Sequence, residues 1–243
     1  MKKILFISLV LITILTQAQN TKFAIGIING IDYYNYSFWG FPDTYTTADG
    51  RTKLIPEGNH KFNNVINFSI GLKFEYNLKN ILIGVNIMNL SKGYKIEYDM
   101  PKDVYNSPVY EISYLKFNYN DFGLNIGYTF FQDKKMSIVP SLGFTYSILS
   151  NTNNIIKLSN GSFTKDENYT DVFVQHTPEK NLYSINGAVS FKLALGTRIK
   201  LILTPYFAQY LNQLEKQAMD KNPMAYGARL SVVYCFGKSK KEE

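Results

Sequence analysis

The sequence predicts an all-β fold, an eight-stranded antiparallel up-and-down β-barrel that spans a membrane. Three observations lead to this prediction. Apolar and polar residues alternate with a period of two in one segment after another, eight such segments follow each other, and the connections between them are alternately long and short. The composition agrees, because 19 Tyr and 17 Phe stand against only 19% charged residues, and aromatic residues favour strands.

Residues 1–18 are predicted to be a secretory signal peptide. Lys2 and Lys3 form its positively charged start. Residues 4–15 form an apolar stretch that is shorter than the roughly 20 residues of a membrane-spanning helix. Small residues precede the expected cleavage site after Ala18. The alternative is an uncleaved N-terminal membrane anchor. Because the sequence has no other long apolar run, a membrane protein of this sequence has to be a β-barrel.

Eight strands are predicted within the barrel domain, residues 19–237. They cover about residues 22–38, 61–77, 80–98, 109–131, 135–150, 182–195, 198–211 and 224–237. The long connections are residues 39–60, 99–108, 151–181 and 212–223, and the short ones are residues 77–80, 132–134 and 195–197. Long extracellular loops and short periplasmic turns are typical of bacterial outer-membrane barrels. Residues 238–243 are predicted to be a charged C-terminal tail.

Two of the long connections contain hairpin signals. Asp49-Gly50 and Asn160-Gly161 each lie between short strand-like segments, and these dipeptides favour type I′ turns. The flanking segments are too short to cross a membrane, so we expect both hairpins to stand above it. The alternative is a barrel of ten strands, in which these segments also span the membrane.

Two further irregularities are expected. Pro140 and Pro205 fall within predicted strands, and because proline lacks a ladder donor, local bulges are expected there. Leu211, Leu214 and Ala218 have helical spacing, which indicates a helical turn in the last long loop.

The apolar faces of the strands are predicted to meet lipid. They contain no Lys, Arg, Asp or Glu, and a Lys or Arg at mid-bilayer depth would cost about 2–4 kcal/mol. The opposite faces are mostly Gly, Ser, Asn and Thr, which fit a narrow lumen. The alternative is a soluble, lipocalin-like barrel with its apolar face inward.

Aromatic residues gather at both ends of the strands, as in the interfacial belts of membrane proteins. The outer belt is expected to contain Tyr33, Tyr34, Tyr36, Phe38, Trp39, Tyr94, Tyr98, Tyr110, Tyr114, Tyr146, Tyr183, Tyr210 and Tyr226. The periplasmic belt is expected to contain Phe23, Phe74, Tyr76, Tyr128, Phe130, Phe131, Tyr234 and Phe236.

Several charged residues are predicted to point into the lumen as a charge network. They are Asp32, Lys73, Glu75, Lys95, Glu97, Asp121, Lys192, Lys200 and Arg229. The interior of an eight-stranded barrel is only wide enough to be filled by side chains, so these charges are expected to pair. Paired charges could form a plug that closes the barrel, or they could line a narrow, gated conduit.

No catalytic, cofactor-binding or metal-binding residues are predicted. Cys235 is the only cysteine, which excludes an internal disulfide and a Cys-based zinc site. The sequence has no H-E-x-x-H, P-loop or Rossmann pattern. Its two histidines, His60 and His176, fall in predicted loops. The net charge is +7, but the basic residues are scattered singly, so no nucleic-acid partner is expected.

With this pattern, the chain resembles the small porin-family proteins of Gram-negative bacteria, the OmpA-like and PorT-like outer-membrane barrels. The resemblance covers the signal and the mature chain. It is carried by Tyr114-Leu115-Lys116-Phe117, Pro140-Ser141-Leu142-Gly143, a last strand that ends in Tyr234-Cys235-Phe236, and Gly227–Val232, which looks like the signal used by the barrel-assembly machinery. Residues 237–243 follow the terminal aromatic residue, which departs from the usual form. The resemblance implies localisation in the outer membrane.

Three functions are considered. The first, which we favour, is a non-enzymatic structural or surface-interaction protein of the envelope with a side-chain-filled lumen. The alternative is a narrow porin for ions or small solutes. The third is a hydrolase that uses His176, with Asp171 five residues before it. The expected partners are outer-membrane lipids, the barrel-assembly machinery during biogenesis, and an extracellular ligand or envelope protein of unknown identity.

Overall fold

The computed structural model describes residues 22–36, 44–46, 52–54, 60–98, 110–131, 135–158, 163–166, 178–215 and 222–236. The predicted signal peptide and the predicted C-terminal tail lie outside these residues. No helix within the described ranges is long and apolar enough to cross a membrane.

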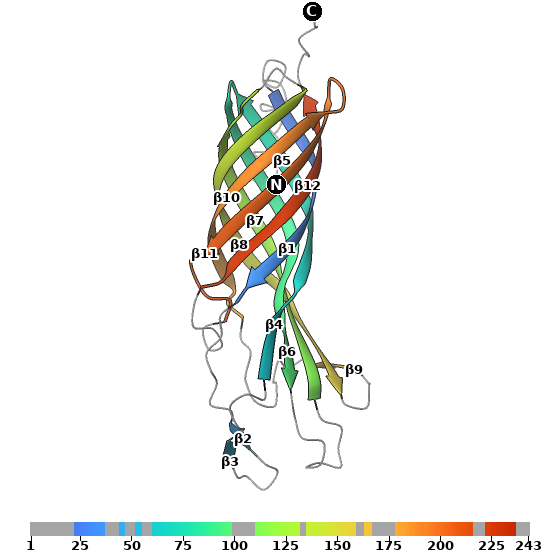
Figure 1. Cartoon of the computed structure of the whole chain (residues 1–243), viewed down its shortest axis with the longest axis vertical. Helices are drawn as coiled ribbons and strands as arrows, with labels where there is room; N and C mark the ends of the chain where they lie inside the picture. The colour runs from blue at the N-terminus through green and yellow to red at the C-terminus, as the bar shows by residue number, and fades with distance from the viewer. Residues whose placement is uncertain are drawn as a thin grey trace, which may run out of the picture.

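Eight antiparallel strands close into a barrel (Figure 1). They are β1 (Lys22–Asn35), β5 (Ile66–Leu78), β6 (Ile81–Tyr98), β7 (Tyr110–Tyr128), β8 (Met136–Leu158), β10 (Asn181–Ala194), β11 (Ile199–Tyr210) and β12 (Met224–Phe236). Each pairs with the next one in this order; the β1–β12 pairing joins the ends of the chain, and the β8–β10 pairing completes the ring. The predicted fold class and strand number are therefore confirmed.

The two ends of the barrel differ. β1 begins, and β12 ends, at the same end of the barrel as the tight β5–β6 turn, because Phe23 pairs with both Phe236 and Tyr76. Lys79 in that turn has φ 52°, a left-handed conformation that closes it in two residues. This is the periplasmic end in the sequence-based prediction, and the long connections leave from the opposite, outer end.

Three strands continue beyond the outer end of the barrel. There β6, β7 and β8 are joined by β4 (His60–Asn64), which pairs with β6, and by β9 (Phe163–Asp166), which pairs with β8 (Figure 1). The predicted strand 61–77 is therefore two strands, β4 and β5, separated at Val65. Residues 151–158, predicted as loop, belong to β8, because they pair with β7 on one side and β9 on the other.

Both predicted hairpins exist as pairs of short strands. β2 (Thr44–Thr46) pairs with β3 (Thr52–Leu54), and the end of β8 pairs with β9. Neither hairpin adds a strand to the closed barrel, so the alternative of ten spanning strands is wrong. The turn dipeptides themselves lie outside the described residues.

The bulges expected at the prolines are not found in the described strands, although the β10–β11 pairing is interrupted at Thr204 and Pro205 without a change of register. The β8–β10 register passes Pro140 without a shift, and Pro205 pairs in register with Ala228. Both prolines lie on exposed positions of their strands. The β7–β8 register shifts lie elsewhere, at Tyr110/Ile112 and Asn118/Tyr119. Residues 211–215 form bends rather than helix, and Ala218 lies outside the described residues.

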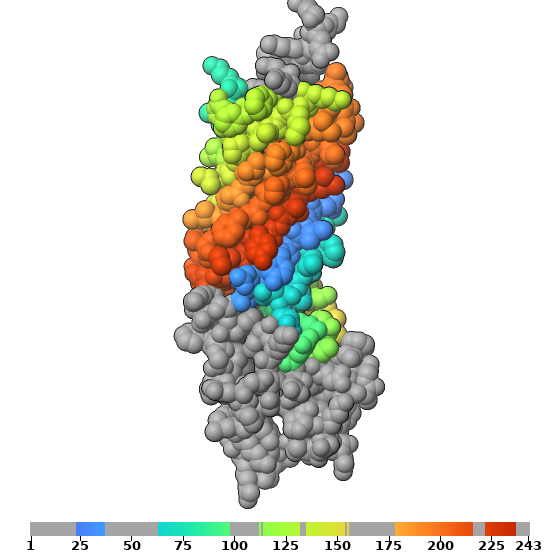
Figure 2. Space-filling view, in the orientation of Figure 1, coloured from blue at the N-terminus to red at the C-terminus, as the bar shows by residue number. Residues whose placement is uncertain are grey.

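The outer wall of the barrel is apolar. Phe68 is 73% exposed and Leu142 is 72% exposed, whereas Asp32 is 0% exposed inside. Figure 2 shows the wall that β1, β10, β11 and β12 form on one side. A soluble barrel would bury its apolar face and solvate its charges, so the lipocalin-like alternative is excluded.

The aromatic belts are confirmed in part. Rings meet on the outer surface at Tyr33–Tyr226, with centroids 4.9 Å apart, and at Tyr146–Tyr183, 5.3 Å apart. Phe23 and Phe236 meet at the periplasmic end, 5.9 Å apart. Four of the tyrosines predicted for the outer belt are instead buried inside the barrel: Tyr34, Tyr36, Tyr94 and Tyr210. Their strands alternate, so the even-numbered residues of β1, β6 and β11 face the lumen there. Phe38 and Trp39 lie outside the described residues.

Candidate functional site

The lumen brings together charged side chains from strands far apart in the sequence. Of the predicted network, Asp32, Lys73, Glu75, Asp121 and Lys192 are buried there. Arg229 is partly buried beside an internal cavity, and Lys200 is partly exposed near the periplasmic end of β11. Because alternate residues of a strand point to opposite faces, residues 73 and 75 of β5 enter the lumen together.

Glu75 is the centre of a cluster of three charges. Its Oε1 lies 3.2 Å from Nζ of Lys73 on the same strand, and its Oε2 lies 2.6 Å from Nζ of Lys192 on β10. One carboxylate therefore contacts two ammonium groups, so the cluster keeps one excess positive charge. The Glu75–Lys192 ion pair crosses the lumen, because β5 and β10 are not neighbours in the sheet.

A second buried cluster surrounds Lys92, which the sequence reasoning missed. Nζ of Lys92 donates to Oδ1 of Asp121 at 2.7 Å and to Oγ of Ser147 at 2.9 Å. The same ammonium lies 4.5 Å from the ring centroid of Tyr119 and 5.5 Å from that of Tyr210. Lys92 is only 1% exposed, so the carboxylate, the hydroxyl and the two rings take the place of the water that would otherwise solvate its ammonium group.

The prediction for Lys95 and Glu97 is wrong. These two residues pair with each other on the opposite face of β6 from Lys92, and their side chains are 23% and 38% exposed. The apolar residues Ile81 and Ile87 fix the odd-numbered positions of β6 as the outer face. Following that alternation through to the end of the strand would have assigned Lys92 to the lumen.

Arg229 belongs to a third group, with Tyr206 and Asp32. The guanidinium carbon lies 4.1 Å from the ring centroid of Tyr206. The Tyr206 hydroxyl donates a hydrogen bond to Oδ1 of Asp32. Tyr206 thus contacts both the Arg229 cation and the Asp32 carboxylate.

Aromatic and aliphatic side chains close the outer end of the lumen. This outer layer consists of Tyr34, Tyr36, Leu90, Tyr94, Ile96, Leu115, Phe117, Tyr119, Leu182, Tyr206, Ala208, Tyr210, Leu214 and Ala225. Residues 211–215, which follow β11, complete it: Leu214 is 1% exposed, and Oε2 of the buried Glu215 accepts a hydrogen bond from the Tyr94 hydroxyl at 2.5 Å. Nothing in the local sequence signals this closure.

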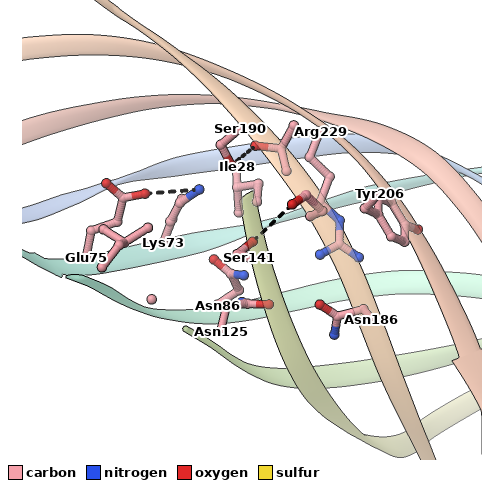
Figure 3. Close-up of a pocket in the computed structure, with 14 residues that line it drawn as sticks. Ile28, Lys73, Glu75, Asn86, Asn125, Ser141, Asn186, Ser190, Tyr206 and Arg229 are labelled. Atoms are coloured by element: carbon pink, nitrogen blue, oxygen red, sulfur yellow. Dashed lines mark hydrogen bonds and ion pairs between the residues drawn. The ribbon is translucent and has the colours of Figure 1, made fainter. Parts of the chain in front are cut away.

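A cavity of about 30 Å³ lies within the lumen. Figure 3 shows Lys73, Asn86, Asn125, Asn186 and Arg229 around it. A cavity of this volume has room for a few water molecules, since one needs roughly 10–15 Å³. The described lumen is therefore filled with side chains, as predicted for an eight-stranded barrel, and the space left in it is polar.

The described residues contain no group of three or more His, Cys, Asp or Glu side chains that could hold a metal ion. His60 begins β4 in the outer extension. His176, on which the hydrolase hypothesis depends, lies outside the described residues, as does Asp171.

No protein-family model matches the chain, and no curated protein matches it by sequence. Several solved outer-membrane barrels are similar to it in structure. The outer membrane protein OprG of Pseudomonas aeruginosa has a TM-score of 0.49 at 10% identity, over 91% of this chain and 99% of that one. The attachment invasion locus protein Ail of Yersinia pestis has a TM-score of 0.41 at 10% identity, over 89% and 99%. Neisserial surface protein A has a TM-score of 0.40 at 10% identity, over 86% and 96%.

The architecture is that of a transmembrane barrel. A closed ring of strands has no open edge, its outer wall is apolar, and its charged side chains are turned inward. These are the properties that let strands cross a bilayer. The chain is a transmembrane β-barrel protein.

Proposed function

We propose that this protein is a non-enzymatic structural or surface-interaction protein of the outer membrane, with a lumen that does not conduct. One observation carries the proposal. The Lys73–Glu75–Lys192 cluster crosses the lumen, and the outer layer of aromatic and aliphatic side chains closes its outer end. The cavity of about 30 Å³ between them is too small for a solute pathway.

The extension of β6, β7 and β8 beyond the barrel supports a role at the outer surface. Side-chain amides pair on the outward face where the extension begins: Asn89 with Asn120 at 3.0 Å at the outer edge of the closed ring, and Asn118 with Asn151 at 2.5 Å beyond it. The exposed Lys116 lies on the same face as the Lys95–Glu97 pair. Ladder hydrogen bonds hold these polar groups in fixed positions outside the membrane, which suits recognition of a partner or stabilisation of the envelope.

The test is single-channel conductance of the refolded barrel in a planar bilayer, with folding checked by heat modifiability on gels. A folded barrel that gives no conductance steps is the expected result. Reproducible steps that change in Glu75→Ala or Arg229→Ala would overturn the closed lumen. They would support the second candidate, a narrow porin, which the polar lining of the cavity favours.

The hydrolase hypothesis has a separate test. If the purified barrel hydrolyses lipids or peptides, His176→Ala should abolish that activity. The non-enzymatic proposal expects no activity in either form, with the same refolding yield.

A further inference from the structure

The Arg229 side chain, which lines the lumen cavity, has a hydrogen-bond donor without an acceptor. Its guanidinium lies beside the cavity in Figure 3, and its Nε is buried without a hydrogen-bond partner. Within the described residues its charge contacts the Tyr206 ring and forms no ion pair with a carboxylate. An arginine enclosed in this way ordinarily has an anionic partner.

The nearby carboxylates are already committed to other groups. Glu75 is shared between Lys73 and Lys192, Asp121 is bound by Lys92, and Oδ1 of Asp32 accepts from the Tyr206 hydroxyl. The cavity is thus bordered by Lys73 and Arg229 with a single carboxylate, Glu75, which has two ammonium neighbours. The electrostatic potential there favours a negative charge.

The rest of the lining suits a small anion rather than an organic one. Asn86 and Asn125 bring amide groups, which can turn an N–H₂ donor toward the cavity, whereas the Asn186 amide and the Ser141 hydroxyl already donate to Thr145 and to the Ala188 carbonyl. The space beside Gly143 is already filled by side chains, because a Cβ on that residue would lie 2.1 Å from Oδ1 of Asn125 and 2.7 Å from Oδ1 of Asn186. A volume of about 30 Å³ accepts a halide-sized ion and excludes carboxylic acids and sugars.

We propose that the lumen cavity between Lys73 and Arg229 binds one small monovalent inorganic anion of the chloride class. The anion neutralises the excess positive charge of the cavity and joins the Glu75 cluster to Arg229. The site does not depend on whether the barrel conducts, so its test is independent of the conductance experiment.

The test compares the thermal unfolding midpoint of the refolded barrel in sodium chloride, sodium bromide and sodium gluconate at equal ionic strength. Gluconate is too large for the cavity. The midpoint should rise with the logarithm of the halide concentration above the dissociation constant, by about 5–10 °C at a hundredfold excess. Arg229→Gln should remove the difference between halide and gluconate. Lys200→Gln, which removes a lysine that does not line the cavity, should keep it.

A midpoint that is the same in all three salts would overturn the proposal, because the cavity would then hold only water. A halide effect that persists unchanged in Arg229→Gln would also overturn it, by assigning the effect to the surface. If Arg229→Gln does not refold, Lys73→Gln takes its place. X-ray anomalous scattering from crystals of the unaltered chain grown in bromide then gives a second readout. A bromide peak beside Arg229 is expected, and its absence would contradict the site.

Discussion

Glu75 and Lys192 form an ion pair of 2.6 Å across the width of the barrel. Their strands, β5 and β10, lie four positions apart in the closed ring whichever way it is followed, so they face each other. The two residues are 117 positions apart in the sequence. Together with Lys73, this pair ties opposite walls of the barrel together and fills the lumen at that level.

Glu75→Gln should destabilise the barrel strongly. The change leaves two buried lysines without a counter-charge, and removing one partner of a buried ion pair costs about 3–5 kcal/mol. Urea unfolding in lipid vesicles measures the effect. Glu97→Gln is the matched control, because Glu97 also follows a lysine by two positions but lies on the outward face; its loss should be about 1 kcal/mol or less. Equal losses would show that the lumen cluster is solvated.

Lys92→Met should be more destabilising than the double variant Lys92→Met with Asp121→Leu. The single change leaves the buried Asp121 carboxylate without its cation, whereas the double change replaces the ion pair by apolar groups, which is often neutral. The difference in unfolding free energy between the two variants measures this. A double variant that loses the sum of the two single changes would mean that the residues act independently.

In the Glu75→Ala background, which removes the ion-pair cluster that fills the lumen below the outer layer, Tyr119→Ala combined with Tyr210→Ala should produce conductance steps that the unaltered barrel lacks. Both rings belong to the outer layer and both contact the Lys92 ammonium, so their removal opens the outer mouth of the lumen. Tyr146→Ala combined with Tyr183→Ala is the control, because this stacked pair lies on the outer surface. If the control conducts as well, the steps arise from general loosening of the barrel.

Leu142→Arg should lower stability in vesicles by about 2–4 kcal/mol, because an arginine at mid-bilayer depth must leave water. Leu142 is 72% exposed on the wall of β8. Leu195→Arg, in the short turn between β10 and β11, should cost about 0–1 kcal/mol, since the cost falls toward the interface. Similar values at both positions would contradict the expected placement of the bilayer.

Part of the candidate site could be predicted from the sequence. The inward positions of Asp32, Glu75 and Lys192 follow from alternation, because each lies within a strand with one clearly apolar face. Lys92 was missed, and Lys95 and Glu97 were assigned to the wrong face, because the polarity of the two faces of β6 inverts where it leaves the membrane: Tyr94 and Ile96 then lie on the lumen side. Reading the polar face of a strand as the inner face holds only where the outer face meets lipid.

The sequence alone determined the all-β class, the eight strands, the apolar outer face and the ends at which long and short connections lie. These properties depend on the two-residue period of a strand and on local turn chemistry, which are readable in any short window. Only the tertiary structure decided that Glu75 meets Lys192, that Tyr206 contacts both Arg229 and Asp32, and that Leu214 closes the outer mouth. Contacts across a lumen depend on the register and tilt of every strand in the ring, and no single segment carries that information.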